Sequence, residues 1–320
     1  MSEFQSFLAP YIEEYKRWCE STGILPENGK ARIKEFDRYC SAHGPYDSEL
    51  DQKTVDEWFK KRNSEKINSC RSRIYPVIAF LKYTNAHEYT HVIIPIPPKA
   101  QGRTYIPHAF TEQELKDFFS QADHLSITGD KTKAAILKLI ISVFFRLIYS
   151  TGMRICEAYW LKVQDVDLEH GIISIRKSKC SIEHYVVLHD SMLEILRIYN
   201  QTMSKMIPDR EYFFSNKDGR PLSQNQVDYF FRRIWKNVSS EYANPYALRH
   251  NYAITNINSW VGDKYAFFDK FVSLSKSMGH MTLESTKYYY SFVPGLADII
   301  EEVSNDSFEE MIPDIEYDED

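Results

Sequence analysis

Apolar residues recur every three or four positions through the first part of the chain, which is the spacing of one face of an amphipathic helix. The pattern runs from Phe4 to Tyr15 and returns at 33–36 and at 55–59. Thr54-x-x-Glu57 stands at the head of the third stretch and predicts a capping box there. We therefore predict a helical domain over residues 1–94.

Residues 95–107 break this pattern with four prolines and one glycine. Proline lacks the backbone N–H that a helix interior needs, so no helix is expected here. The stretch predicts a semi-rigid linker, followed by a second domain over residues 108–300.

Helical signals resume after the linker. Thr111-x-x-Glu114 predicts a capping box, across which Phe110 and Leu115 are placed to form a hydrophobic staple. Residues 134–149 are apolar on every side, which is typical of a helix buried in a core, and we expect Ser150-Thr151-Gly152 to end it.

One part of the second domain is patterned as strands. Residues 172–175 and 185–188 are rich in β-branched side chains and predict two strands of an antiparallel hairpin, with a turn at 165–171 before them. Ser223-x-x-Gln226 predicts the start of a helix over 227–238, and the rest to residue 297 is expected to be mostly helical. The predicted fold class is mainly α with a small antiparallel β-sheet (α+β).

The composition is that of an ordinary soluble protein, and 320 residues suffice for two domains. No run approaches the roughly 18 apolar residues that span a bilayer, and the first residues do not resemble a signal peptide. Five cysteines without Cys-x-x-Cys spacing argue against a disulfide framework and a zinc site. We expect a cytoplasmic protein with reduced thiols and no contact with a membrane.

The net charge of −6 is unevenly distributed. Residues 301–320 carry ten acidic side chains and no lysine or arginine, so residues 1–300 have 39 basic against 35 acidic side chains, a net charge of about +4. A mildly basic body can present a basic face to nucleic acid although the whole chain is acidic. We interpret residues 301–320 as an acidic tail.

Three consecutive tyrosines, Tyr288–Tyr290, follow a Gly279-His280 pair. Aromatic rows usually pack in a core, and this is one interpretation. A phenol can also act as a nucleophile, provided that cationic and hydrogen-bonding groups polarise its target and accept its proton. The second interpretation requires basic partners elsewhere in the chain.

Three other segments supply such partners. Thr151-Gly152-Met153-Arg154 places an arginine at a helix start with Glu157 on the same face, Arg249 follows Tyr246, and lysines stand at the tip of the predicted hairpin. Each motif alone occurs by chance in many proteins. Together, in this order and spacing, they resemble the tyrosine recombinases of the phage integrase family over nearly the whole chain.

The resemblance implies a helical core-binding domain of SAM-like fold at residues 1–94 and a mixed α/β catalytic domain at 108–300. It implies an enzyme that cleaves and rejoins double-stranded DNA at a specific crossover site through a covalent 3′-phosphotyrosyl intermediate, with neither a metal nor a nucleotide cofactor. The expected partners are DNA and further copies of the chain in a synaptic tetramer. Companion recombinases or a directionality factor are left open.

The resemblance also implies roles for individual residues. Arg154 and Arg249 would hold the phosphate oxygens, because guanidinium groups bind them bidentately and stay charged. The family's lysine, which donates a proton to the departing 5′-oxygen, falls on Lys179, with Lys177 as an alternative. The family's second histidine falls on His280, for which a capping or core position is the other interpretation.

Nine residues after this histidine the family has its nucleophile, which selects Tyr289, with Tyr288 and Tyr290 as alternatives. Glu157 is expected to orient Arg154 or Lys179, or to form a simple intrahelical salt bridge.

One position departs from the family pattern, because Tyr246 stands where a histidine is usual. A phenol can donate a hydrogen bond to a phosphate oxygen, but a pKa of about 10 makes it a poor proton acceptor at neutral pH. The general base is therefore left open. His250 is expected to be structural.

Basic residues in both domains predict a DNA-contacting surface, with a solvated helix face as the other interpretation. They are Lys60, Lys61, Arg62, Lys66, Arg71 and Arg73 in the first domain and Arg232 and Arg233 in the second. Direct base readout is expected from the helix that carries the second pair and from helices of the first domain.

Two other functions fit the same residues: a DNA-relaxing enzyme like the type IB topoisomerases, and a DNA-binding protein of recombinase ancestry with impaired catalysis. No separate arm-binding module precedes Phe4, so we expect a simple-site recombinase or one that works with companions. Among phage integration, transposon movement and chromosome dimer resolution, we favour a mobile-element integrase over an Xer-like enzyme. Apolar residues within 292–300 are expected to dock onto a neighbouring protomer, and the acidic tail to compete for the basic face.

Overall fold

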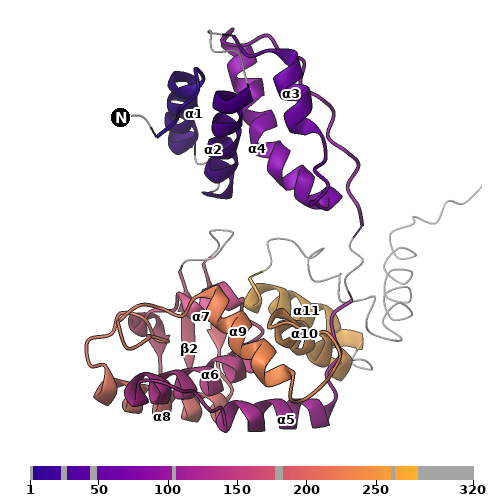
Figure 1. The fold of residues 1–320 in the computed structure, drawn as a ribbon. Helices are drawn as coiled ribbons and strands as arrows, with labels where there is room; N and C mark the ends of the chain where they lie inside the picture. Colours follow the sequence, from indigo (N-terminus) through magenta and orange to yellow (C-terminus); the bar gives the residue numbers. More distant parts are fainter. Residues whose placement is uncertain are drawn as a thin grey trace, which may run out of the picture. The chain divides into compact units, whose positions relative to one another are not determined.

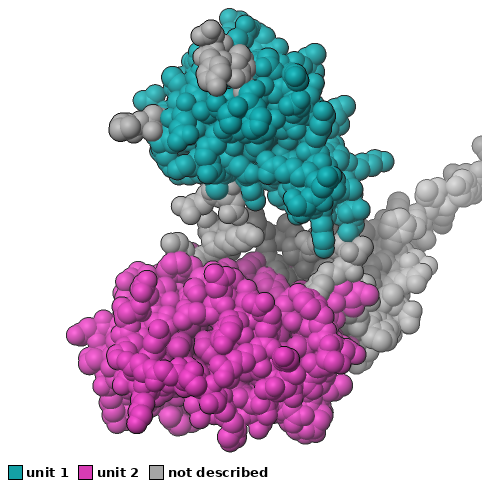
Figure 2. All heavy atoms as spheres, in the orientation of Figure 1, with its two compact units in different colours: residues 1–105 teal, residues 106–320 magenta. Residues whose placement is uncertain are grey.

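The computed structural model describes residues 3–22, 27–43, 49–102, 106–176, 183–260 and 264–279. The chain forms two compact units, Met1–Tyr105 and Ile106–Asp320, which Figure 2 shows in different colours. The division falls inside the proline-containing stretch 95–107.

The described part of the first unit is a bundle of four helices (Figure 1). The apolar faces of the helices meet in a core that contains Phe36 and Trp58. The buried carboxylate of Asp37 accepts hydrogen bonds from the backbone N–H groups of Gln5 and Ser6, which ties the N-terminal segment to the second helix. The four helices are α1 (Ala9–Thr22), α2 (Glu27–His43), α3 (Gln52–Phe59) and α4 (Ile67–Ala86).

α3 begins before Thr54, so the capping box expected at Thr54 and Glu57 is wrong. The N-cap is Asp51, whose side chain accepts a hydrogen bond from the Thr54 backbone N–H at 2.6 Å. The hydroxyl of Thr54 also donates to Asp51, at 3.1 Å. A carboxylate at the N-cap satisfies a backbone donor that the helix itself leaves unpaired, and it is favourable at the positive end of the helix.

The proline-containing segment is held against α3 and α4. Asn68 exchanges two hydrogen bonds with the backbone of Gln101, at 2.9 and 3.0 Å, and Arg71 donates to the Pro98 carbonyl. Gln52 likewise exchanges two hydrogen bonds with the backbone of Ile93, at 2.8 and 2.7 Å. Side chains of the helices thus pair backbone groups that an extended, proline-rich segment cannot pair by itself.

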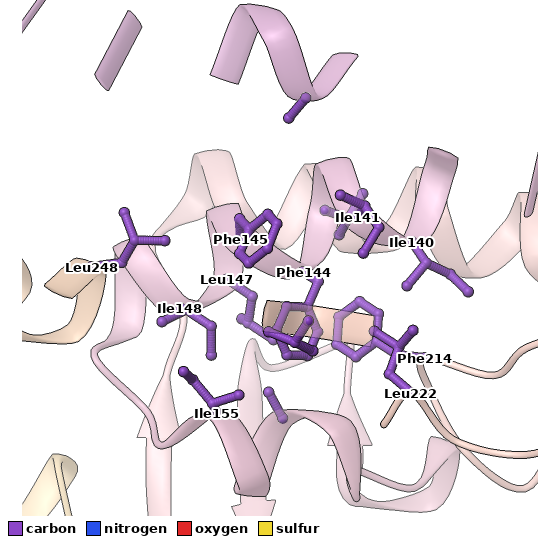
Figure 3. Packing of buried hydrophobic residues seen from close by; sticks show 14 of the residues in the cluster. Ile140, Ile141, Phe144, Phe145, Leu147, Ile148, Ile155, Phe214, Leu222 and Leu248 are labelled. Carbon is purple, nitrogen blue, oxygen red and sulfur yellow. The ribbon is translucent and has the colours of Figure 1, made fainter. Parts of the chain in front are cut away.

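The second unit is built around α6 (Lys131–Thr151), which is apolar except for a polar stripe that includes Lys138, Ser142 and Arg146, the last two bonded to Asp123. Ile140, Phe144 and Ile148 of α6 meet Phe214 and Leu222 in the core (Figure 3). This confirms the predicted buried helix. The helices that contact α6 include α5 (Glu112–Asp123), α7 (Ile155–Tyr159), α8 (Asp190–Met206) and α10 (Tyr246–Trp260).

α6 also satisfies the length and hydropathy that a membrane-spanning helix requires, against the expectation that no segment does. Within its most apolar stretch, 56% is buried inside the fold. A helix at the centre of a core has the same composition, because neighbouring side chains surround it as lipid would. Of the helices that the structure describes, α6 alone passes this test.

Two predicted capping boxes are confirmed in this unit. Thr111 and Glu114 form one at the start of α5, and Ser223 and Gln226 form the other at the start of α9 (Gln224–Trp235). In each, the N-cap hydroxyl accepts from the backbone of the fourth residue, whose side chain accepts from the N-cap N–H.

A three-stranded antiparallel sheet completes the described fold, in the order β1 (Val166–Asp167), β2 (Ile172–Ile175), β3 (His184–Val187). Ile172 pairs with Val187 and Ile175 with His184, which confirms the predicted hairpin. The predicted turn at 165–171 is partly wrong, because it contains β1 paired to β2. The predicted fold class, mainly helical with a small antiparallel sheet, is confirmed.

A small separate core positions the end of the described chain. It joins α10 to α11 (Lys264–Ser277) through Ala253, Ile257, Phe271, Leu274 and Met278. The turn Met278–Gly279 is thereby anchored against α10.

Candidate active site

The site begins where α6 ends. Gly152 takes the left-handed conformation, with φ of 62°, and its N–H donates to the Ile148 carbonyl at 2.9 Å, which confirms the predicted glycine stop. A Cβ atom at this position would collide with the ring of Tyr252 on α10. A larger residue would therefore separate α10 from the end of α6.

Arg154 stands at the N-terminus of α7 and is held by Glu157. Its backbone N–H and its Nη1 donate to the two carboxylate oxygens, at 2.8 and 2.7 Å. The Glu157 side chain is 0% exposed, so its charge cannot turn to solvent and the guanidinium is strongly oriented. The contact is both an intrahelical salt bridge and an orienting bond. Lys179, the other expected partner of Glu157, lies outside the described residues.

Arg249 on α10 is the second predicted arginine, and it is 1% exposed. Its Nη1 donates to the Gly152 carbonyl at 2.6 Å and its Nη2 to the Met278 carbonyl at 2.9 Å. A guanidinium is tolerated inside a protein only where such bonds replace its hydration. Arg249 thereby connects the end of α6 to the turn after α11.

The two arginines meet at this turn. Arg154 Nη2 donates to the carbonyl of Gly279, the neighbour of the Met278 carbonyl that Arg249 binds. Gly279 has a φ of 63°, and a Cβ atom on it would lie 2.7 Å from Arg154 Nη1 and 2.5 Å from Cε1 of His184. Glycine alone fits, because both the backbone conformation and the space exclude a side chain.

The structure thus brings Arg154, Glu157 and Arg249 together directly before His280 in the chain. The other predicted catalytic residues lie outside the described part of the chain: His280, Lys179 and its alternative Lys177, and Tyr289 with its alternatives Tyr288 and Tyr290. The same holds for the docking segment 292–300 and the acidic tail. In sequence, Lys179 stands between the end of β2 and the start of β3.

Tyr246 is the first residue of α10 and is 38% exposed. Cζ of Arg249 lies 5.9 Å from the centre of its ring, and the ring of His250 lies 5.4 Å from it. On its outer side Tyr246 lines a hollow of about 490 Å³ together with Asp228 and Arg232 of α9. A phenol in this place can donate a hydrogen bond to an anionic ligand bound over Arg249.

Most of the basic residues predicted in the first unit are exposed. Lys60 and Lys61 follow the end of α3, and Arg62 beside them pairs with Glu35 at 2.8 Å. Arg71 is half-buried and lies over the ring of Tyr75, with 4.9 Å from Cζ to the ring centre. Exposed guanidinium and ammonium groups of this kind can contact phosphates.

Arg73 is buried, which corrects the expectation that it contacts DNA. Its side chain is 2% exposed, and it donates to both carboxylate oxygens of Glu65, at 2.6 and 3.1 Å. It also donates to the backbone carbonyls of Trp58 and Lys60. The hydrogen bond from Arg73 lowers the pKa of Glu65 to about 2, so the pair stays charged at neutral pH. Arg73 has a structural role in the first unit.

Arg232 and Arg233 on α9 are not equivalent. Arg232 is exposed, its Nε donates to the Asp228 carbonyl at 3.1 Å, and it lines the hollow beside Tyr246. Arg233 donates instead to the Ser126 carbonyl, in the connection between α5 and α6. Neighbouring helix positions point about 100° apart, which separates the two side chains. Of this pair, Arg232 is the residue at the site.

Cys156 lies between Arg154 and Glu157 in sequence. Burial raises the pKa of its thiol, and the Glu157 carboxylate adds to the increase. A thiol attacks efficiently only as the thiolate, so Cys156 is not a competing nucleophile at neutral pH.

One residue at the site, His184, was not predicted. It is the first residue of β3, its side chain is 8% exposed, and its Nε2 lies 3.9 Å from Oε2 of Glu157. Strand alternation places position 184 on the same face as the buried Val186. The strand was predicted from residue 185, one position too late; had it included 184, alternation with Val186 could have placed this histidine on the inner face.

Known proteins resemble this chain in sequence and fold. The sequence model of the phage integrase family matches residues 109–293. Tyrosine recombinase XerC of Bacillus pumilus is 25% identical over 285 residues, which cover 87% of this chain and 82% of the relative. A tyrosine recombinase of Agathobacter rectalis is 26% identical over 298 residues, which cover 88% of this chain and 92% of the relative.

Among solved structures, the Tn1549 transposon integrase in complex with transposon right end DNA has the same fold. Its TM-score is 0.61 at 17% identity, over 95% of this chain and 100% of that one. Because the family match extends over more than half of the 320 residues, this chain belongs to the phage integrase family and is a tyrosine recombinase.

Proposed function

We propose that this tyrosine recombinase cleaves and rejoins DNA at a specific crossover site, with Tyr289 as the nucleophile and Arg154 and Arg249 as the phosphate clamp. The observation that carries the proposal is the convergence of both guanidinium groups on the turn Met278–Gly279. Tyr289 follows Gly279 by ten residues. One segment therefore links the clamp to the nucleophile.

In the first step the Tyr289 oxygen attacks the scissile phosphorus, and the bond from phosphorus to the 5′-oxygen breaks. The two guanidinium groups stabilise the negative charge that builds on the non-bridging oxygens. Lys179 gives a proton to the departing 5′-oxygen, and His280 hydrogen-bonds the phosphate. A free 5′-hydroxyl then attacks the phosphorus of the 3′-phosphotyrosyl group, the bond from phosphorus to the Tyr289 oxygen breaks, and the DNA strands are rejoined.

Tyr246 takes the place of a histidine in this scheme and donates a hydrogen bond to the phosphate from its position beside Arg249. A phenol with a pKa of about 10 accepts a proton poorly. The proton of Tyr289 therefore leaves by a route other than Tyr246.

DNA contacts are assigned to the exposed basic residues Lys60, Lys61 and Arg62 and the half-buried Arg71 in the first unit, and to the exposed Arg232 in the second. Residues 1–94 act as a core-binding domain, 95–107 as the linker and 108–300 as the catalytic domain. The chain acts on cytoplasmic DNA as a synaptic tetramer, to integrate or excise a mobile element, with companion recombinases or a directionality factor as further partners. The Tn1549 integrase, solved with transposon DNA, supports the assignment of DNA as the partner.

A nicked suicide substrate tests the chemistry. The short 5′-fragment diffuses away after cleavage, so the covalent protein–DNA adduct accumulates and migrates slowly on a denaturing gel. We expect the adduct with the wild-type chain and with Tyr288→Phe and Tyr290→Phe, and none with Tyr289→Phe. Loss in a neighbouring variant instead would move the nucleophile by one position. DNA binding without any adduct in the wild type would contradict the proposal.

A further inference from the structure

We propose that His184 is a positioning residue of the phosphate clamp, which holds Glu157 and, through it, Arg154. The inference rests on the proposed function. It adds a residue from β3 to a clamp otherwise built from α7, α10 and the turn after α11.

The side chain of His184 lies on the inner face of β3 together with the buried Val186. Its side chain is 8% exposed, whereas Tyr185 and Val187 are 71% and 75% exposed. Burial of a polar ring is unfavourable unless polar groups surround it. The Nε2 atom of the ring lies 3.9 Å from Oε2 of Glu157 on α7, a contact longer than a hydrogen bond.

The carboxylate of Glu157 lies between Arg154 and His184. Its Oε1 accepts from Arg154 Nη1 at 2.7 Å, and its Oε2 accepts from the Arg154 backbone N–H at 2.8 Å. Nε2 of His184 lies 3.9 Å from the same Oε2. The carboxylate therefore cannot rotate away from Arg154 on that side without displacing the imidazole.

His184 also packs against the turn Met278–Gly279, whose carbonyls both arginines bind. A Cβ on Gly279 would lie 2.5 Å from Cε1 and 3.0 Å from Nδ1 of His184, and 2.7 Å from Nη1 of Arg154. The imidazole, the guanidinium and the turn backbone thus occupy one packed layer. Tightly packed groups transmit displacement, so loss of the ring would leave space into which Arg154 and the turn can shift.

This arrangement predicts an effect on the rate of cleavage and not on DNA affinity. A clamp works only when its donors match the positions of the phosphate oxygens in the transition state. DNA affinity comes instead from many phosphate contacts over the whole protein. A change at His184 should therefore separate the two quantities.

The test uses the full chain and the suicide substrate, and measures the first-order rate of adduct formation at saturating protein. We expect His184→Ala, folded at the assay temperature, to react about ten- to a hundredfold more slowly with an unchanged DNA dissociation constant. His184→Gln should be less impaired, because a longer side chain fills more of the ring's space and keeps a polar group beside Glu157. Val187→Ala, an exposed position on the same strand, is the matched control and should react at the wild-type rate.

Two altered substrates show which part of the reaction is affected. A methylphosphonate at the scissile position removes one charged non-bridging oxygen and with it much of the need for the clamp. It should narrow the difference between wild type and His184→Ala, as it should for Arg154→Ala. A sulfur at the bridging 5′-position departs without protonation by a general acid. This substrate should therefore restore the cleavage rate of Lys179→Ala and should not restore that of His184→Ala.

The outcomes separate this inference from the proposed function. Absence of an adduct with the wild-type chain would overturn both. A wild-type adduct with an unchanged rate in His184→Ala, or a defect that only the bridging sulfur relieves, would overturn the inference alone. Should His184→Ala not fold, His184→Asn, which leaves most of the ring's space empty, takes its place with the same expectations.

Discussion

Each unit buries an arginine almost completely, but the hydrogen-bond partners of the two arginines differ in how far they lie along the chain. Arg73 of the first unit is 2% exposed and Arg249 of the second is 1% exposed. The hydrogen-bond partner of Arg73 that lies farthest away in sequence is Trp58, only 15 positions before it. Arg249 binds carbonyls of Gly152 and Met278, which are 97 and 29 positions away. The hydrogen bonds of Arg73 join residues close in sequence and stabilise that part of the first unit. The hydrogen bonds of Arg249 join segments far apart in sequence, which is how the residues of an active site are brought together.

Arg154 combines both kinds of bonding. Its link to Glu157 spans three positions, and its link to the Gly279 carbonyl spans 125. The first bond sets the direction of the guanidinium within α7. The second places it at the segment that leads to the proposed nucleophile.

Removal of Arg249 should cause the largest loss. Arg249→Ala deprives the phosphate of one cationic partner, so we expect adduct formation to slow about a thousandfold, ~4 kcal/mol in transition-state stabilisation. Arg249→Lys should recover little, because an ammonium lacks the planar fork of a guanidinium. Timed gels give the rate and fluorescence anisotropy gives DNA binding. Equal losses in both would place Arg249 in binding and contradict the clamp.

Removal of the Arg73 guanidinium should lower the stability of the fold and leave the rate of adduct formation unchanged. Arg73→Met keeps an apolar stem but leaves the Glu65 carboxylate without its partner, and we expect the free energy of unfolding to fall by about 3 kcal/mol. Denaturant titration measures this. Arg62→Met, which breaks the exposed pair with Glu35, is the matched control and should change stability by less than about 1 kcal/mol. A slower adduct rate in folded Arg73→Met would contradict the comparison.

Two glycines with positive φ, substituted by alanine, allow the effect of crowding at the site to be distinguished from the effect of backbone strain. Gly279→Ala brings a methyl group within 2.7 Å of Arg154 Nη1, so the adduct rate should fall. We expect a reduction of about ten- to a hundredfold. Gly219, with φ of 79° and no atom within 4 Å of an added Cβ, is the control. Gly219→Ala should cost about 1 kcal/mol of stability and leave the rate unchanged, and similar rates for the two variants would disprove the crowding.

The last expected effect is a pH dependence of the Arg73–Glu65 pair. The pKa of Glu65 is lowered from 4.5 to about 2 in the folded chain, so its contribution to stability is complete above about pH 4.5 and is lost as the pH falls toward 2. Glu65→Gln should lower the free energy of unfolding by about 2 kcal/mol at neutral pH. The difference from wild type should shrink as the pH decreases. A difference independent of pH would mean that the charge of Glu65 contributes nothing.

Local signals in the sequence predicted local structure well. The capping boxes at Thr111 and Ser223, the glycine stop at Gly152 and the β2–β3 hairpin depend on residues a few positions apart, and the structure has them. The Thr54 capping box failed because Asp51, a stronger candidate nearby, caps the helix instead. The short strand β1 was missed because two residues carry too little pattern to distinguish a strand from a turn.

The burial of charged groups was not predictable in the same way. Arg73 and Arg71 look alike in sequence, two positions apart, yet one is buried against Glu65 and the other lies over Tyr75 near the surface. Which side of α4 faces the core depends on how α2 and α3 pack on it. His184 could be placed on the inner face of β3 by alternation, but its neighbours Glu157 and Gly279 belong to other segments.

The sequence by itself determined the family, the fold class, and the residue types and spacing of the arginines, because these follow from local periodicity and from the order of motifs along the chain. Only the tertiary structure decided which charged groups are buried, and that Arg154 and Arg249 meet on one turn with His184 against Glu157. The physical reason is that hydrogen bonds spanning 97 and 125 positions depend on how α7, α10 and the end of α11 pack together. No local pattern in the sequence encodes that packing.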